Sequence, residues 1–163
     1  MTHQPFITAR MGSIVQQPDC DAVVNAANSR LRAGSGVCGA IHDAAGPKLE
    51  PFATELAPIE TGSAIITPGF QMHNPWIIHA VGPKYLLDPD PGTLLAQTMH
   101  SIVRLAEEHQ IRRIAVPAIS TGVYGYPMDE AAPVLVQAAR AAIRPVTSLK
   151  EIRFVLTSPA AQS

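Results

Sequence analysis

Short apolar runs alternate along the chain with longer stretches in which apolar residues recur three and four positions apart. Six runs have the length and composition of β-strands: 6–9, 22–26, 63–67, 76–81, 114–117 and 151–156. Three stretches have the spacing of amphipathic helices: 37–45, 94–109 with Thr93 as N-cap, and 129–143. Strands that alternate with helices predict a largely parallel sheet covered by helices on both faces.

Two polar, glycine-containing loops follow predicted strands and lead into predicted helices. Loop 28–39 follows strand 22–26, and loop 120–127 follows strand 114–117. Parallel sheets bind ligands beyond the carboxyl ends of their strands. Glycine lets the main chain approach an anion, and a helix N-terminus offers unpaired N–H groups. If the two strands are neighbours, the loops form two walls of one cleft and hold a phosphate or diphosphate ester without a lysine.

Other ligand-binding patterns are absent from the sequence. Neither the lysine-bearing phosphate loop G-x-x-x-x-G-K-S/T nor the dinucleotide pattern G-x-G-x-x-G occurs. Histidines and carboxylates do not fall at metal-ligand spacing. We therefore expect no metal and no cofactor.

The composition is that of one folded domain. A length of 163 residues fits about one domain, and 47% hydrophobic against 15% charged residues excludes a disordered chain. The formal charge of −1 argues against a protein that neutralises a nucleic-acid backbone, and two cysteines suggest a reducing compartment. Because a signal-peptide pattern and a long apolar stretch are both missing, we expect a cytoplasmic protein without a membrane partner.

Four sequence blocks occur in the order typical of one known family. The blocks are 24–28 (VNAAN), 34–42 (GSGVCGAIH), 79–83 (HAVGP) and 117–127 (PAISTGVYGYP). Over about residues 12–157 the chain resembles the macrodomains, and within them the bacterial branch of O-acetyl-ADP-ribose deacetylases and mono-ADP-ribosyl hydrolases. The resemblance implies a three-layer α/β/α fold with a mixed, largely parallel central sheet. It also implies that residues 1–163 form a single macrodomain, with 157–163 as a loose tail.

The resemblance further implies a site for ADP-ribose at which ADP-ribosyl or acetyl groups are removed without a metal. Asn28 is expected to bind the distal ribose, where the reaction occurs, Cys38 to lie near the attacking water, and Tyr124 to pack over that ribose. The other ligand-binding residues implied are Ser13, Ile14, Asn25, Ala33, Gly34, Ser35, Gly36, Val37, Ser120, Thr121, Gly122, Val123, Gly125 and Thr157. Turn-capping is the alternative interpretation of both asparagines, and Tyr126 fits either the core or the ligand.

Cys38 departs from the family pattern at the reacting end. Hydrolases of this branch often carry an aspartate there, which is thought to position or activate the attacking water. A thiol does not copy a carboxylate, although a helix N-terminus can lower the pKa of a cysteine toward thiolate formation. Removing one acid–base group typically costs ~10²–10⁴-fold in rate. We therefore expect slow turnover, in which the substrate's own phosphate helps to orient the water.

Three further departures concern the adenosine end and the chain terminus. Ser13 stands where the family usually has an aspartate that accepts a hydrogen bond from adenine, and Thr157 stands where many relatives have an aromatic residue. The sequence stops at Ser163, where relatives usually continue into a terminal helix. These departures suggest that recognition has shifted toward the diphosphate and the distal ribose, with weaker discrimination for adenine.

Two functions remain open on the sequence. One is slow hydrolysis of ADP-ribosyl or O-acetyl-ADP-ribose esters; the other is non-catalytic recognition of ADP-ribose or a related diphosphate–ribose metabolite. Asn28 and Tyr124 favour the enzyme, whereas Cys38 and the altered adenosine end favour the reader. The implied partners are ADP-ribose, ADP-ribosylated protein and O-acetyl-ADP-ribose; we expect a monomer and no nucleic-acid partner.

Three other reactive side chains have ordinary explanations. His79 lies in an apolar strand and is expected to be a buried, hydrogen-bonded histidine. Cys38 and His42 are four residues apart on one helix, which permits a Cys–His pair, but the charged residues nearby favour a solvated face for His42. Ser120 lacks the G-x-S-x-G elbow of serine hydrolases and is explained by the glycine loop.

Overall fold

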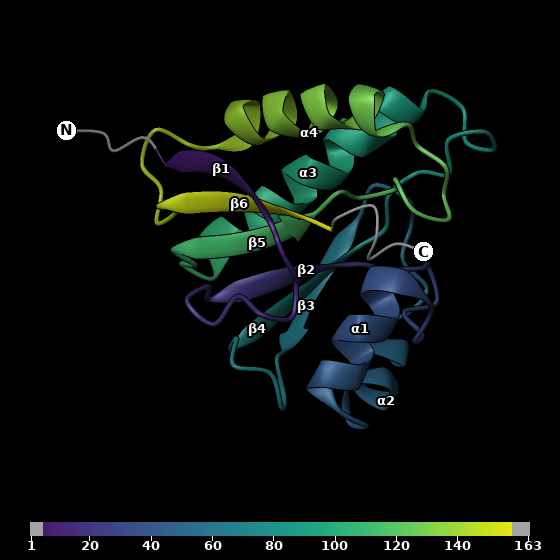
Figure 1. Ribbon diagram of the computed structural model, residues 1–163, viewed down its shortest axis with the longest axis vertical. Coiled ribbons are helices and arrows are strands. Elements are labelled where there is room, and N and C mark those ends of the chain that lie inside the picture. Colours follow the sequence, from purple (N-terminus) through teal and green to yellow (C-terminus); the bar gives the residue numbers. More distant parts are fainter. Residues whose placement is uncertain (1–4, 158–163) are drawn as a thin grey trace.

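Six strands form one mixed sheet in the computed structural model, which describes residues 5–157 (Figure 1). Helices α3 (Pro91–Glu108) and α4 (Met128–Ala142) cover one face of the sheet, and α1 (Gly36–Ala45) and α2 (Leu49–Thr54) cover the other. The predicted three-layer α/β/α architecture is confirmed. The predicted tail lies outside the described residues apart from Thr157.

The sheet is parallel except at one edge. Its strands are β1 (Phe6–Met11), β2 (Ala22–Ala26), β3 (Ala64–Pro68), β4 (Trp76–Ala80), β5 (Arg113–Pro117) and β6 (Glu151–Leu156). They lie in the order β1-β6-β5-β2-β4-β3, and only β3 runs antiparallel to its neighbour. The other five strands therefore end at the same edge of the sheet.

The central strand β2 separates two hydrophobic cores. Ala22 and Val24 face the core beneath α3 and α4, whereas Val23 faces the core beneath α1 and α2. Successive side chains of a strand point to opposite faces, so a strand covered on both sides has no exposed polar face, and Asn25, the one polar residue of β2, is buried as well. This burial explains why the run 22–26 shows no polar alternation.

Helix α3 begins two residues before the predicted N-cap. Pro91 occupies its first turn, where a missing N–H costs nothing. Thr93 lies inside the helix, and its hydroxyl donates to Asp90 Oδ2 at 2.8 Å. The prediction that Thr93 caps the helix is therefore wrong. The buried stripe of α3 consists of Leu95, Thr98, Met99, Ile102, Val103 and Ala106.

Helix α2 was not expected from the sequence. It has six residues, too few for an apolar period to show, and Pro51 lies in its first turn. Leu49 and Ala53 hold it against the sheet, since both are fully buried in the core shared with α1. Tertiary packing, and not helix propensity, accounts for this element.

Segment 12–21, which joins β1 to β2, covers part of the sheet that the helices leave open. Arg153 of β6 lies under it with its side chain 2% exposed, and bonds both carboxylate oxygens of Asp19 at 2.8 and 2.7 Å. The same guanidinium donates to Glu151 at 2.8 Å and to Gln17 at 2.9 Å. The buried charge is thus fully paired.

Within residues 5–157, no helix has both the length and the apolar character that crossing a bilayer requires.

Candidate functional site

The two predicted loops leave the sheet from neighbouring strands. Strands β2 and β5 pair in parallel, with Ala22 opposite Ile114 and Val23 opposite Ala115. Loop 28–39 follows β2 and loop 120–127 follows β5, so both extend from the same edge. The sequence predicted one phosphate-binding cleft if these two strands are neighbours, and the pairing of β2 with β5 meets that condition.

The first loop ends in an uncapped helix N-terminus. Ser35 is the N-cap of α1, yet its side chain makes no capping hydrogen bond, and the first turn of the helix carries no acidic residue. Gly36 has a φ of +60°, and a Cβ at Gly39 would overlap the carbonyl oxygen of Gly34. Glycine is therefore required for the loop to fold back on the helix. The first-turn N–H groups and the positive end of the helix dipole remain available to an anion.

Asn28 holds the first loop closed. Its Nδ2 donates to the carbonyl oxygen of Arg32 at 2.9 Å, and its Oδ1 accepts from the N–H of Arg32 at 3.1 Å. The turn-capping interpretation of Asn28 thus describes this state of the loop. The N–H of the neighbouring Ala33 donates to Glu50 Oε2 of α2 at 2.6 Å, so this predicted ligand residue already uses its amide within the protein.

Cys38 is a buried thiol. It is 6% exposed, its Sγ donates to the carbonyl oxygen of Arg32 at 3.4 Å, and Sγ accepts from Asn25 Nδ2 at 3.8 Å. Burial raises the pKa of Cys38 above its ordinary value. The sequence-based suggestion that the helix N-terminus lowers this pKa is therefore wrong, because desolvation of the thiolate outweighs the hydrogen bonds that favour it.

The second loop consists of two tight turns. Ser120 has a φ of +69°, is buried, and accepts a hydrogen bond at its carbonyl oxygen from the N–H of Tyr126 at 2.9 Å. The hydroxyl of Thr121 donates to the carbonyl oxygen of Ala118 at 2.6 Å, and the N–H of Gly125 donates to Gly122 at 3.0 Å. The predicted ligand residues Gly122, Val123 and Gly125 are exposed. The loop therefore presents main chain to solvent at its tip.

Tyr124 and Tyr126 have different surroundings. Tyr124 is half-buried, its carbonyl oxygen accepts from the N–H of Tyr85 at 2.9 Å, and Lys84 Nζ lies 5.4 Å from its ring centroid. Burial raises the pKa of the Tyr124 hydroxyl, and the closeness of Cys38 adds to the rise. Tyr126 belongs to the core, where its ring lies 4.8 Å from that of Tyr85 between centroids.

The residues predicted for the adenosine end lie at the same edge of the sheet. Ser13 follows β1 and Thr157 follows β6, and these strands pair through Met11 and Leu156. The Ser13 hydroxyl accepts from the N–H of Val15 at 3.3 Å and so stabilises its own turn. Ile14 is buried in the core shared with α1, so its side chain is part of the fold.

Three buried side-chain polar atoms have no hydrogen-bond partner among residues 5–157: Asn25 Oδ1, His42 Nε2 and Ser120 Oγ. All three belong to elements of the candidate site, namely β2, α1 and the loop after β5. Proteins pair nearly all such groups, and leaving one unpaired costs about 1–3 kcal/mol. Two of the three, Asn25 Oδ1 and Ser120 Oγ, lie at or just beyond the carboxyl ends of β2 and β5, where a bound molecule or water can supply the missing partner.

The two histidines of the region are both buried. His79 is fully buried and hydrogen-bonded on both ring nitrogens, to Asn25 at 3.1 Å and to Thr67 at 2.9 Å, which confirms the prediction of a satisfied core histidine. His42 is also buried, so the predicted solvated face is wrong. In the described part of the chain, Cys38 and His42 share no hydrogen bond.

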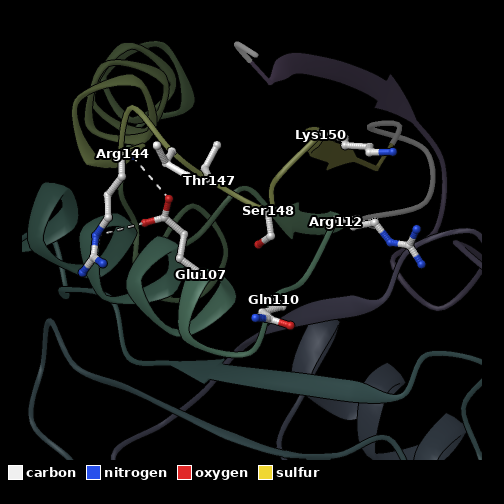
Figure 2. Close-up of a pocket in the computed structure, with 8 residues that line it drawn as sticks. Glu107, Gln110, Arg112, Arg144, Thr147, Ser148 and Lys150 are labelled. Carbon is white, nitrogen blue, oxygen red and sulfur yellow. Dashed lines mark hydrogen bonds and ion pairs between the residues drawn. The ribbon is translucent and has the colours of Figure 1, made fainter. Parts of the chain in front are cut away.

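A separate pocket of about 720 Å³ lies at the opposite edge of the sheet (Figure 2). Its lining residues are Glu107, Gln110, Arg112, Arg144, Val146, Thr147, Ser148 and Lys150. Glu107 and Arg144 form an ion pair at 3.7 Å, and the pocket lies where α3 and α4 end and where β5 and β6 begin. Arg144 is engaged within the protein through its ion pair with Glu107, and Arg112 and Lys150 directly precede β5 and β6.

Comparison with known proteins identifies the family of this chain. The Macro domain model matches residues 24–135, a range that includes both loops. The chain belongs to the Macro domain family. A Macro domain-containing protein of Ralstonia nicotianae is 50% identical over 122 residues, covering 74% of this chain and 71% of that protein.

Two further relatives have informative names. The ADP-ribose glycohydrolase MACROD2 of Xenopus laevis is 46% identical over 120 residues, which cover 72% of this macrodomain but only 29% of that protein. A solved structure of an Oceanobacillus iheyensis macrodomain mutant with ADPR has a TM-score of 0.89 and 35% identity, and covers 99% of this chain and 92% of that chain.

Proposed function

We propose that this macrodomain binds ADP-ribose at the carboxyl edge of β2 and β5. The diphosphate accepts hydrogen bonds from main-chain N–H groups of Gly34–Cys38 on one side and of Ser120–Tyr124 on the other. The observation that carries the proposal is the pairing of β2 with β5, which brings an uncapped helix N-terminus and a second glycine loop to one edge. The ADPR-containing relative supports the choice of ligand.

In this proposal Asn28 exchanges its bond to Arg32 for one to the distal ribose. Among residues 5–157, the Nδ2 and Oδ1 atoms of Asn28 are hydrogen-bonded only to the main chain of Arg32, at 2.9 and 3.1 Å. Opening this pair frees one donor and one acceptor, which match the hydroxyl groups of a ribose. Tyr124 then packs over the ribose from the second loop.

We further propose slow, metal-independent hydrolysis of ADP-ribosyl or O-acetyl-ADP-ribose esters. In O-acetyl-ADP-ribose, water attacks the acetyl carbon, the bond from that carbon to the ribose oxygen breaks, and acetate and ADP-ribose form. In an ADP-ribosyl ester, water attacks the anomeric carbon, the bond from that carbon to the carboxyl oxygen breaks, and ADP-ribose and the free carboxylate of the protein form. Because the Cys38 thiol is neutral, it is a poor proton acceptor, so a phosphate oxygen of the substrate orients the water. The relative from Xenopus laevis is named an ADP-ribose glycohydrolase, which supports this chemistry.

A non-catalytic reader of ADP-ribose is the second candidate. The neutral, buried Cys38 favours it, since a thiol stands where hydrolases of this family often carry an aspartate. Wild-type protein and a Cys38→Asp variant, incubated with ester-linked ADP-ribosylated protein and with O-acetyl-ADP-ribose, separate the two. We expect slow release by the wild type and faster release, by roughly 10²-fold or more, by Cys38→Asp. Tight binding without release by either protein would leave only the reader.

The adenosine end carries a separate proposal, that adenine is weakly discriminated. Ser13 is a neutral side chain that already caps its own turn, so a charge-assisted bond to adenine is lost. Calorimetry with ADP-ribose and UDP-ribose tests this, and we expect affinities within about tenfold of each other, less than the contribution of one strong hydrogen bond. A preference for ADP-ribose well above tenfold would contradict it.

A further inference from the structure

Four buried polar side chains form a continuous chain across the sheet toward the first loop. Thr67 of β3 contacts His79 of β4 at 2.9 Å, His79 contacts Asn25 of β2 at 3.1 Å, and Asn25 donates to Cys38 of α1 at 3.8 Å. The side chains of Asn25, His79 and Thr67 lie on the face covered by α1, since they alternate with residues of the other core. All four residues are buried.

Main-chain carbonyl oxygens close both ends of this polar chain. At one end, the Thr67 hydroxyl donates to the carbonyl oxygen of Pro68 at 3.1 Å. At the other end, the Cys38 thiol donates to the carbonyl oxygen of Arg32 at 3.4 Å. A carbonyl oxygen only accepts hydrogen bonds, so the two ends determine the direction of every bond between them.

The direction of the bonds selects one tautomer of His79. The Thr67 hydroxyl has a single hydrogen; with that hydrogen directed to Pro68, its oxygen accepts from the ring, and Nε2 of His79 carries the proton. Nδ1 is then an acceptor, so the atom of Asn25 that faces it at 3.1 Å is the amide nitrogen. Both hydrogens of that nitrogen are used, one toward His79 and one toward Cys38.

We propose that Thr67 and His79 are positioning residues of the candidate site, which orient the Asn25 amide and through it the Cys38 thiol. Cys38 then donates to Arg32, the same residue whose main chain binds Asn28. The inference rests on the proposed function of this site. It assigns a role to the antiparallel edge strand, which contributes no residue to the predicted loops.

The same arrangement limits what Asn25 offers to a ligand. Its amide nitrogen is occupied, and its Oδ1 is buried without a partner among the described residues. Asn25 therefore acts toward a bound ligand or water only as an acceptor. A hydroxyl group or a water molecule fits this acceptor, whereas a phosphate oxygen does not.

The pair Thr67→Val and Thr67→Ser tests the inference. Valine keeps the shape of threonine but leaves Nε2–H of His79 without an acceptor, whereas serine keeps the hydroxyl. Long-range ¹H–¹⁵N correlation spectra should show His79 of the wild type and of Thr67→Ser as a single neutral tautomer with its proton on Nε2. By calorimetry, Thr67→Val should bind ADP-ribose roughly tenfold more weakly or worse, and Thr67→Ser within about threefold of the wild type.

A second pair keeps the test valid if Thr67→Val does not fold. His79→Gln can donate to Thr67 and accept from Asn25, whereas His79→Leu can do neither, so only the first should retain affinity. A wild-type proton on Nδ1, or folded Val and Leu variants that bind like their Ser and Gln counterparts, would overturn the inference. Absence of ADP-ribose binding by the wild type would instead overturn the proposed function. The tautomer of His79 would still decide the direction of the hydrogen bonds among the four side chains.

Discussion

Asn28 and Cys38 donate hydrogen bonds to the same atom, the carbonyl oxygen of Arg32, at 2.9 and 3.4 Å. The residue proposed to bind the distal ribose and the residue beside the proposed water therefore share one main-chain anchor. A ligand that draws Asn28 away from Arg32 leaves that carbonyl to Cys38 alone. Binding at Asn28 and the orientation of the thiol are coupled through this oxygen.

Replacement of Asn28 tests the ribose end of the site. Asn28→Ala removes both the ribose contact and the bond that holds Arg32, so we expect release of ADP-ribose from ester-linked substrate to fall by about 10²–10³-fold, as for the loss of one positioned donor. Ser29→Ala, at the exposed neighbouring position, is the matched control and should retain wild-type activity. Equal rates for the wild type and Asn28→Ala would contradict the assigned role.

Thiol reactivity tests the state of Cys38. Both cysteines are buried; burial raises the pKa of Cys20 to about 11 and also raises that of Cys38. Only the thiolate reacts with a disulfide reagent. In a Cys20→Ala variant at neutral pH, we expect Cys38 to react more slowly than in the protein unfolded by guanidinium, since burial lowers the thiolate fraction and restricts access to the sulfur. A thiol that reacts faster in the folded protein would be evidence for a thiolate.

The pH dependence of stability should report the neutral His79. Burial lowers the pKa of His79 to about 3, below the ordinary value of 6.5 in the unfolded chain. The unfolded state therefore binds the proton first, and the free energy of unfolding falls as pH drops from about 6.5, with a slope approaching about 1.4 kcal/mol per pH unit.

A variant comparison isolates this contribution. Burial also lowers the pKa of His42, which contributes over the same range, whereas hydrogen bonds from Arg153 lower the pKa of Asp19 to about 2 and shift its effect to more acidic pH. Urea unfolding between pH 7.5 and 5 should therefore give a shallower slope for His79→Gln than for the wild type. The same slope for both proteins would contradict a neutral, buried His79.

The hydrogen bonds and ion pairs of Arg153 with Asp19, Glu151 and Gln17 should contribute strongly to the free energy of unfolding. Arg153→Met leaves the nearly buried Glu151 carboxylate without its partner at 2.8 Å, and breaking such a buried pair costs about 3–5 kcal/mol. The control is Arg104→Met, which breaks an exposed i,i+4 pair with Glu108 worth less than about 1 kcal/mol. Equal losses in urea unfolding would show that the buried network adds nothing beyond a surface pair.

The sequence predicted the parts of the molecule that depend on local pattern. Apolar periodicity located the six strands and three of the helices, and the glycine loops were identified because glycine and small polar residues followed strands. The sequence did not predict helix α2, because its six residues span less than two turns and are too few to show an apolar period. The start of α3 was misplaced because Pro91 begins a helix as readily as it breaks one.

Relationships between distant residues could not be predicted in this way. The hydrogen bond between Thr67 and His79 depends on how β3 pairs with β4. The two strands are antiparallel, with Ile65 opposite His79 and Thr67 opposite Ile77, so Thr67 is a diagonal neighbour of His79 on the same face of the sheet. The raised pKa of Cys38 depends on its burial between α1 and the sheet, which outweighs the hydrogen bonds from Asn25 and Gly34 that favour the thiolate. His42 was assigned to solvent because charged residues are near it in sequence, although its own side chain faces the interior.

Binding of ADP-ribose at the carboxyl edge of β2 and β5 is tested most directly by an ADP-ribose titration of ¹⁵N-labelled protein, followed by the chemical shift of each main-chain amide. We expect saturable binding, with the largest shifts at the N–H groups of residues 34–38 and 120–124 and at the side-chain amide of Asn28. Shifts confined to the pocket around Arg112 and Lys150, or no saturable shifts at all, would contradict it.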